Sequence, residues 1–386
     1  MHPTQSSTPP AGQRPQMLLR ALAVALVFAV ALWLRLRAVA LLPTDFDEDD
    51  YLRAGQLYAK HLAADDWAAV IDERENYEHP PMTKLAYGAI LLREGPESYA
   101  RPVIALKDNN GGSPIIARKA RGLRVFSAVV GALTAALVAV INPLAGLLVA
   151  FNTWHIKYTS QAMLEALPCL LAALTALLLW RSRRAGDTAF WLSAAALGLT
   201  AAGKYLYAVV GLAGLAWLIW RERAEIRRPG LWARLLGWGG LALLIFYACD
   251  PALWPDPLGR LRESLLFSER YASSQHVRNA GYGWWQPLRW LFGSVPWHPG
   301  VFPLLLDGLF AAIGLLGLWR AWREQRLLAL WFAAMMLFLF AWPTKWPQYI
   351  LTVTVPISLI AAGQLGGWWR WAEARWRMRR PKRSGA

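Results

Sequence analysis

Long apolar runs alternate with short polar connections along most of the chain. A helix needs about 20 apolar residues to cross a bilayer upright, and some of the runs are shorter than this. The runs cover residues 18–41, 123–141, 143–160, 162–180, 188–203, 205–220, 234–249, 299–319, 327–342 and 349–367. The pattern predicts an all-α polytopic membrane protein with about ten transmembrane helices.

Basic residues gather in alternate connections, which predicts how the helices are oriented. Arginine-rich stretches are RSRR at 181–184, RERAEIRR at 221–228, RAWREQR at 320–326 and the C-terminal RWRMRRPKR. Because cytoplasmic connections carry the excess of Lys and Arg, both termini are predicted to be cytoplasmic. The INP turn at 141–143 has no charge, so the hairpin around it is the least determined part of this topology.

Two long connections then lie on the extracytoplasmic side, residues 43–122 and residues 250–298. Each contains a segment with apolar residues at helical spacing, YLRAGQLYAKHLAADDW and PLGRLRESLLFSERY, which predicts juxtamembrane amphipathic helices. The expected organisation is a cytoplasmic tail (1–17), a transmembrane catalytic domain that includes both connections (18–367) and a basic cytoplasmic tail (368–386).

Composition supports membrane insertion and argues against nucleic-acid binding. The formal net charge is +16, but the arginines cluster between apolar runs, and 56% of the residues are hydrophobic. The two cysteines, Cys169 and Cys249, lie inside apolar runs and indicate packing rather than disulfides. A cleaved signal peptide is the alternative for the first run, but the run is too long and Arg35 and Arg37 interrupt its end, which favours an uncleaved span.

An acidic cluster follows the first span. Five of the six residues from Asp45 to Asp50 are carboxylates. Acids favour the first turn of a helix, and this explains some of them. A cap needs fewer, however, and mutual repulsion raises carboxylate pKa values, which makes a better proton acceptor near neutral pH. Asp47 and Glu48 are the candidate catalytic residues.

A second candidate element is the stretch NYEHPPMTKL, residues 76 to 85. A residue before proline is confined to extended backbone, and the diproline stiffens the backbone after it, so His79 is predicted to sit on a rigid elbow. An ordinary loop with helix-breaking prolines is the alternative. Glu78 and His79 are also the candidate ligands of a divalent cation, although one His with carboxylates is a weak metal signature.

Cations form a third group, at the predicted outer ends of the spans. They are Arg35, Arg37, Arg121, Arg124, Lys204 and Lys345. Some are expected to reach lipid headgroups, but a cation facing a cavity usually has a partner, and a lipid phosphate is the obvious one. A polar interruption with His155, Lys157 and Glu165 is expected to line the same cavity. His276 and His298 are expected to be structural loop residues.

These motifs, in this order, resemble the GT-C superfamily of polyprenyl-phosphate-sugar glycosyltransferases, especially protein O-mannosyltransferases and the lipid A aminoarabinose transferase. The resemblance is carried by DEDDY at 47–51 after the first span and HPPMTK at 79–84, followed by GLRVFSAVVGAL, HIKYTSQAMLE, GKYLY, DPALWPDPLGRL and KWPQYIL. It covers about residues 18 to 367. The chain departs from the mannosyltransferase pattern at Met82–Thr83. It is also expected to lack the extra soluble domain of eukaryotic protein mannosyltransferases and many aminoarabinose transferases, so the resemblance does not identify the acceptor.

The resemblance implies roles for residues at the matching positions. Asp47 would be the general base, and Glu48 would position the acceptor or assist. Arg124, with Lys345, would hold the donor phosphate, and His79 would line the donor pocket or help to bind a metal. The remaining implied substrate contacts are Tyr51, Lys84, Lys204 and Tyr349.

The predicted function is transfer of a hexosyl or pentosyl group from a polyprenyl-phosphate donor to a hydroxyl of a protein, lipid or glycan acceptor. Transfer would occur on the extracytoplasmic side of the inner membrane, with inversion. Such a site needs a base for the incoming hydroxyl and positive charge for the departing phosphate. The alternative is a transporter or flippase of a lipid-linked solute. Transporters usually show repeated halves and midplane sites, whereas the polar residues here concentrate at one face.

Overall fold

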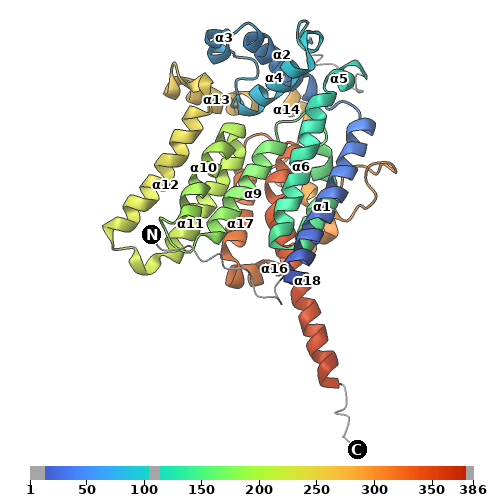
Figure 1. The fold of residues 1–386 in the computed structure, drawn as a ribbon, viewed down its shortest axis with the longest axis vertical. Helices are drawn as coiled ribbons and strands as arrows, with labels where there is room; N and C mark the ends of the chain where they lie inside the picture. The colour runs from blue at the N-terminus through green and yellow to red at the C-terminus, as the bar shows by residue number, and fades with distance from the viewer. Residues whose placement is uncertain (1–13, 104–113, 380–386) are drawn as a thin grey trace, which may run out of the picture.

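The computed structural model describes residues 14–103 and 114–379, and every regular element in these ranges is a helix. This confirms the predicted all-α class. Most of the predicted tail 1–17 lies outside the described residues. The predicted tail 368–386 begins inside a helix, α18 (Leu351–Arg379), whose C-terminal part projects from the rest of the molecule (Figure 1).

Apolar helices run side by side and form the body of the protein (Figure 1). Besides α18, the body contains α1 (Arg14–Leu41), α6 (Arg121–Ile141), α9 (Ala166–Arg181), α10 (Thr188–Gly203), α11 (Val210–Arg221), α12 (Pro229–Ala248), α16 (Asp307–Glu324) and α17 (Arg326–Ala341). By length and composition, α1, α6, α12 and the helical stretch Pro347–Met378 can each cross a membrane, and shorter apolar helices pack among them. The chain is therefore a multi-pass membrane protein.

The predicted span 143–160 is wrong in one respect, because the structure breaks it into two short helices. These are α7 (Pro143–Phe151) and α8 (Thr153–Tyr158). The side chain of Asn142 accepts hydrogen bonds from the backbone of the first turn of α7, and the side chain of Asn152 accepts one from His155 N at the start of α8. Asparagine is a preferred N-cap residue, so each one starts a new helix.

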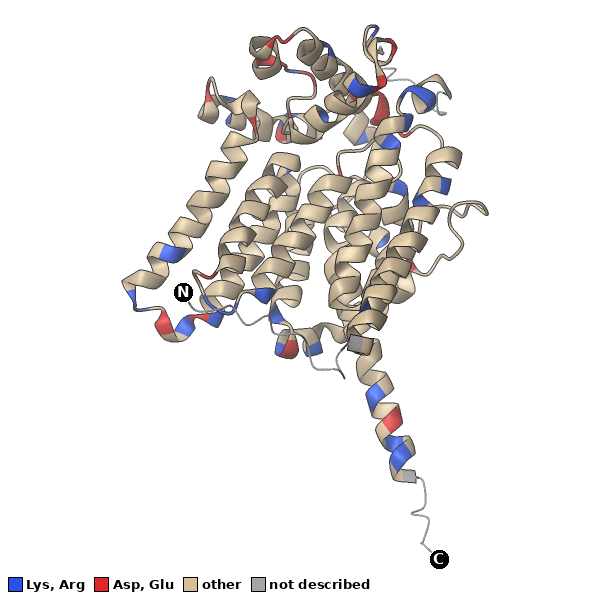
Figure 2. Cartoon of the chain, viewed as in Figure 1, with Lys and Arg blue, Asp and Glu red and all other residues tan. Residues whose placement is uncertain are grey.

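The two ends of the helical body differ. One end, here called the loop face, carries α2 (Glu48–Ala63), α3 (Trp67–Asp72), α4 (Met82–Glu94), α5 (Pro114–Lys119), α13 (Pro257–Ala272) and α14 (Gln275–Ala280), and it lies at the top of Figure 1. The opposite end, here called the basic face, carries Arg181, Arg221, Arg228, Arg323 and Arg326 at helix ends and in connections. Acidic and basic residues mix on the loop face (Figure 2).

Helices α2 and α4 pack tightly against each other and form the base of the loop face. Tyr58 of α2 and Tyr87 of α4 are both buried, and a Cβ at Gly55 of α2 would lie 3.0 Å from the Tyr87 Cβ. A Cβ at Gly88 would lie 2.8 Å from the Tyr58 Cβ, so only glycine permits this approach. The predicted amphipathic helices of both long connections are thus present, as α2 and α13.

A buried guanidinium lies inside the helical body just below the loop face. Arg35 of α1 is fully buried, and its Nε donates to Thr159 Oγ1 at 2.9 Å. One of its terminal nitrogens lies 2.6 Å from His155 Nδ1. A Cβ at Gly131 of α6 would lie 2.3 Å from Thr159 Oγ1 and 2.8 Å from Arg35 Nε. Glycine at 131 therefore leaves the space that this network occupies.

Candidate functional site

Asp47 lies at the N-terminus of α2, on the loop face. It is the N-cap residue of α2, yet its side chain makes no capping hydrogen bond. Instead Asp47 Oδ2 accepts a hydrogen bond of 3.1 Å from Gln348 Nε2, in the short 3₁₀ helix Pro347–Ile350. Burial and then the negative charge of Asp45 raise the pKa of Asp47 to about 8, against the opposing positive charge of Lys204. Asp47 is thus a half-buried carboxyl poised to gain or lose a proton near neutral pH.

Glu48, the neighbouring candidate, is fully buried and fully bonded. Arg124 Nε donates to Glu48 Oε1 at 2.8 Å and Arg124 Nη2 donates to Glu48 Oε2 at 2.5 Å. The backbone N–H groups of Ala162 and Asp45 also donate to this carboxylate, at 2.6 and 2.9 Å. Burial raises the pKa of Glu48, and Arg124 counteracts that effect. The geometry suits a structural anchor.

The terminal N–H groups of Arg124 also donate hydrogen bonds to the end of α1. Its terminal nitrogens donate to the carbonyl oxygens of Val39, Leu42 and Pro43 at 3.3, 2.9 and 3.2 Å. The guanidinium therefore joins α6, the end of α1 and the acidic segment. The structure places Arg124 at a junction beside the candidate site, with its N–H groups directed at protein oxygens.

The positive charge of Lys204 acts on Asp47 and opposes the rise in its pKa. Lys204 is the buried C-cap residue of α10, and its Nζ forms an ion pair with Glu165 Oε1 at the start of α9. An ammonium has three N–H donors, and within the described residues Lys204 Nζ donates one hydrogen bond, which Glu165 Oε1 accepts. Glu165 Oε2 is buried without a hydrogen-bond partner there. The centroid of the Tyr349 ring lies 5.8 Å from Lys204 Nζ.

The HPP segment lies in a turn before α4, close to Lys204. Lys84 Nζ donates to the carbonyl oxygens of Glu75, Asn76 and His79 at 3.1, 2.7 and 2.9 Å, which fixes the turn before α4. Burial lowers the pKa of Lys84 to about 8. Thr83 Oγ1 donates to Gly203 O at 3.4 Å, so this segment is attached to the residue before Lys204.

His79 and Tyr51 lie close to each other, beside Lys204 and Asp47. Their ring centroids are 6.0 Å apart, and Tyr51 is buried on α2 one turn after Asp47. Burial, together with the charges of Lys204 and Lys84, lowers the pKa of His79 well below its usual value. The imidazole is therefore neutral at pH 7 and can accept or donate a hydrogen bond without carrying charge.

The candidate metal ligands do not form a metal-binding group with a third side chain in the described ranges. No cluster of three or more His, Cys, Asp or Glu side chains there could hold a metal ion. Glu78 Oε1 accepts a hydrogen bond of 2.8 Å from Asn76 Nδ2, and burial raises its pKa. A pair of protein ligands is fewer than known structural or catalytic zinc sites use.

A group of aromatic rings lies near Asp47. The His276 ring stacks on Phe46, the residue before Asp47, with centroids 4.9 Å apart, and lies 5.2 Å from the Trp346 ring. The ring centroids of Tyr271 and His276 are 6.3 Å apart. Burial, and then the negative charge of Asp47, raise the pKa of Tyr271 to about 12. His276 is thus a stacking residue at the edge of the site.

The structure gathers some of the predicted residues and separates others. One group of predicted residues lies together on the loop face and forms the candidate site: Asp47, Tyr51, His79, Lys204 and Tyr349. Lys84 and Lys345 instead direct their ammonium groups at backbone carbonyls, those of Phe340 and Trp342 for Lys345.

Sequence reasoning missed Gln348 altogether and did not pair Glu165 with Lys204. Gln348 stands next to Tyr349 in KWPQYIL, where a polar residue beside an apolar run was the available signal.

Comparisons with known proteins support the fold. No protein-family model matches the chain, and no curated protein sequence matches it. Two crystal structures of ArnT from Cupriavidus metallidurans are similar to it. One, bound to undecaprenyl phosphate, is 17% identical with a TM-score of 0.54 and matches 91% of this chain and 60% of that one. The other, in the apo state, is 16% identical with a TM-score of 0.53 and matches 93% and 62%.

The chain thus spans about 60% of the length of these ArnT structures. At this level of identity the likeness shows the fold alone. It shows that the chain shares the fold of these structures, a body of apolar helices with further helices on one face.

Proposed function

We propose that the protein is a membrane glycosyltransferase that moves a sugar from a polyprenyl-phosphate donor to an acceptor hydroxyl. The observation that carries this proposal is the pairing of Asp47, whose carboxyl has a pKa of about 8, with the opposing charge of the buried Lys204. A glycosyl phosphate already has a good leaving group, so a base and a cation are the two groups that the reaction needs.

In the proposed reaction Asp47 accepts the proton of the acceptor hydroxyl. The hydroxyl oxygen attacks the anomeric carbon while the bond from that carbon to the phosphate oxygen breaks, and its electron pair stays on the phosphate. Lys204, with the Tyr349 ring nearby, neutralises the charge that develops there. Direct displacement inverts the anomeric carbon. His79 and Tyr51 border the donor, and Gln348 holds the Asp47 carboxylate in place.

The ArnT structure bound to undecaprenyl phosphate supports a polyprenyl-phosphate donor, because the present chain has the same fold. The side of the membrane follows from charge. The connections at the basic face carry clusters of arginine, and cytoplasmic connections are enriched in Lys and Arg (Figure 2). The loop face, with Asp47, is therefore proposed to be extracytoplasmic and both termini cytoplasmic.

The test is transfer of radiolabelled sugar from a polyprenyl-phosphate donor to membrane acceptors by the full chain and by Asp47→Asn. Loss of a general base lowers a rate by about 10²- to 10⁴-fold, and this loss is expected. Asp50→Asn is the matched control, since it removes a carboxylate from the same cluster, and it should retain most of the activity. Transfer at the wild-type rate by a correctly folded Asp47→Asn protein would overturn the assignment.

A further inference from the structure

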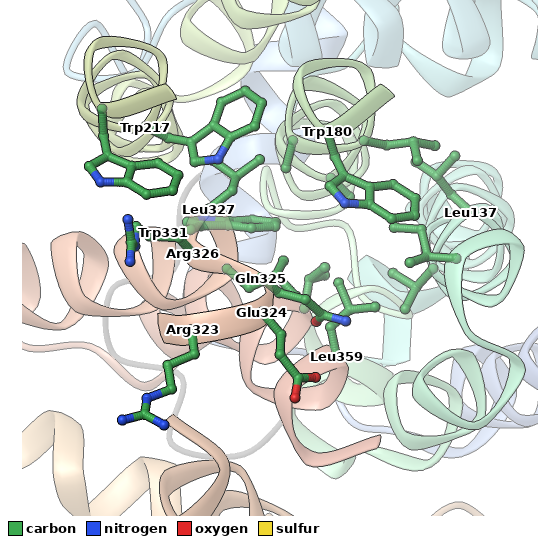
Figure 3. Close-up of a pocket in the computed structure, with 18 residues that line it drawn as sticks. Leu137, Trp180, Trp217, Arg323, Glu324, Gln325, Arg326, Leu327, Trp331 and Leu359 are labelled. Carbon is green, nitrogen blue, oxygen red and sulfur yellow. The ribbon is translucent and has the colours of Figure 1, made fainter. Parts of the chain in front are cut away.

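A cavity of about 260 Å³ lies near the basic face, at the opposite end of the helical body from Asp47. Its walls come from α6, α9, α11, α17 and α18, and Trp180, Trp217 and Trp331 project around it (Figure 3). The lining of α9 runs from Trp180, near the end of that helix, to Ala173. Seven residues of helix rise by about 10 Å, so the cavity reaches well into the apolar layer.

The cavity exists because small side chains stand where the helices would otherwise close. Ala173 and Ala176 of α9 face it and are buried, as are Val138 of α6 and Leu359 of α18. The interior walls are hydrocarbon and indole surface. An apolar cavity of this kind stays dry in a protein and takes apolar ligands. Hydrocarbon is therefore the chemistry that fits its interior.

The mouth of the cavity is charged. The connection between α16 and α17 supplies it, and the Arg326 guanidinium lies 3.5 Å from the centroid of the Trp220 ring. Arg326 Nε donates to Trp322 O at 3.1 Å. Arg323 lies over the Trp319 ring at 4.6 Å. Within the described residues neither arginine forms an ion pair, and the nearby Glu324 carboxylate is paired with Arg320 at 2.9 Å.

The Arg326 guanidinium, which forms no ion pair in the described part of the chain, thus stands at the opening of a hydrocarbon-lined cavity. Guanidinium groups stacked on indole remain able to bind phosphate through their free N–H groups. The cytoplasmic leaflet is the one rich in anionic lipid, and the basic face is the end expected there by charge. The size, apolar walls and basic mouth all match one class of ligand.

We propose that this cavity binds one acyl chain of an anionic phospholipid of the cytoplasmic leaflet, with the lipid phosphate on Arg326. The site is separate from Asp47 and does not depend on the proposed transfer reaction. An anionic phospholipid is favoured over a polyprenyl phosphate because its headgroup is abundant at this face of the membrane.

The test uses the purified full chain, stripped of lipid in detergent, and measures the binding of added phosphatidylglycerol by native mass spectrometry. Arg326→Ala should weaken binding by about tenfold, the effect of losing charge-assisted hydrogen bonds. Ala176→Phe should fill the cavity and weaken binding similarly. The control is Arg228→Ala. Arg228 is exposed, pairs with Glu225 and does not line the cavity, so binding should not change.

Phosphatidylcholine should bind much more weakly than phosphatidylglycerol to the wild-type protein. Equal binding of the two lipids, or equal binding by Arg326→Ala and Arg228→Ala, would overturn the proposal. Preference for undecaprenyl phosphate over phosphatidylglycerol would also overturn it, in favour of a second polyprenyl site. Thermal unfolding of Ala176→Phe shows whether that variant is folded, and Arg326→Ala, near the surface, gives an independent answer. Sugar transfer assayed in parallel separates this result from the proposed function.

Discussion

Arg124 donates two hydrogen bonds, 2.8 and 2.5 Å long, to the carboxylate of Glu48, a residue 76 positions earlier in the sequence. Both side chains are buried, at 1% and 0% exposure. The pair fixes the start of α2 against α6 and leaves the adjacent Asp47 directed at Gln348. Of two adjacent acids, one is an anchor and the other is available for chemistry.

Removal of one partner of this pair should destabilise the protein. Truncating one member of a buried ion pair costs about 3–5 kcal/mol, because the other charge is left buried and unpaired. We expect Arg124→Met to lower the midpoint of thermal unfolding strongly in detergent, and the double variant Glu48→Gln with Arg124→Met to recover part of the loss. Arg262→Met, on α13, is the control for removing an arginine from the loop face.

The contrary outcome would be equally informative. If Arg124→Met unfolds at the wild-type temperature but binds undecaprenyl phosphate about tenfold more weakly, Arg124 contacts the donor phosphate directly. The role implied by the family resemblance would then hold.

The rate of transfer should depend on the protonation of Asp47. A carboxylate accepts a proton only when it is ionised, so activity should rise with pH and level off above about 8, the pKa of Asp47. Because the negative charge of Asp45 raises that pKa, Asp45→Asn should move the rising limb to lower pH. The measurement is the initial rate of transfer across a pH series that brackets this pKa on both sides.

Asp72→Asn provides the matched comparison. Asp72 pairs with Arg260 and its side chain is 74% exposed, so the limb should not move. A rising limb near pH ~4 in the wild-type protein would show that Asp47 titrates like an ordinary carboxyl or that another group limits the rate.

Changes at Glu165 and Lys204 should have opposite effects. Lys204→Gln removes the positive charge that lowers the Asp47 pKa, so the rising limb should move to higher pH and donor binding should weaken. Glu165→Gln removes a negative charge that raises that pKa and frees Lys204, so the limb should move down and binding should strengthen.

Donor affinity can be measured with undecaprenyl phosphate by isothermal calorimetry and the limb from the same rate profiles. Shifts in the same direction for both variants would mean that the pair acts only by supporting the fold.

Metal removal should leave transfer unchanged. Within the described ranges, Glu78 and His79 have no third His, Cys, Asp or Glu side chain placed to complete a metal site. We expect incubation with a chelator, followed by gel filtration into metal-free buffer, to preserve the initial rate. A rate that disappears and returns on addition of one divalent cation would contradict this expectation. His79→Ala would then be expected to weaken the affinity for that cation.

The apolar runs predicted most of the helices, because membrane helices satisfy their backbone hydrogen bonds internally and need long stretches of apolar residues. The exceptions are local. Asn152 breaks the run 143–160 because its side chain caps a new helix, and capping competes with apolarity over only a few residues. The run from 299 begins helical structure only at Asp307.

The sequence predicted which residues belong to the site but not which hydrogen bonds and ion pairs they form. A sequence places cations near a span end but does not say which oxygens they reach. Lys84 and Lys204 were both implied substrate contacts, yet Lys84 donates to three backbone carbonyls and Lys204 forms an ion pair with Glu165. That difference depends on contacts between distant segments, which no local pattern contains.

Gly131 predicts a constraint on the sequences of homologues. Any side chain there would displace Thr159 or Arg35, since even a methyl carbon would sit 2.3 Å from the Thr159 hydroxyl oxygen. A homologue that retains the buried arginine and its histidine partner must therefore retain glycine at this point of α6. One that has lost the arginine is released from the constraint. Covariation of these positions separates true descendants of this architecture from chains that share only its hydrophobic outline.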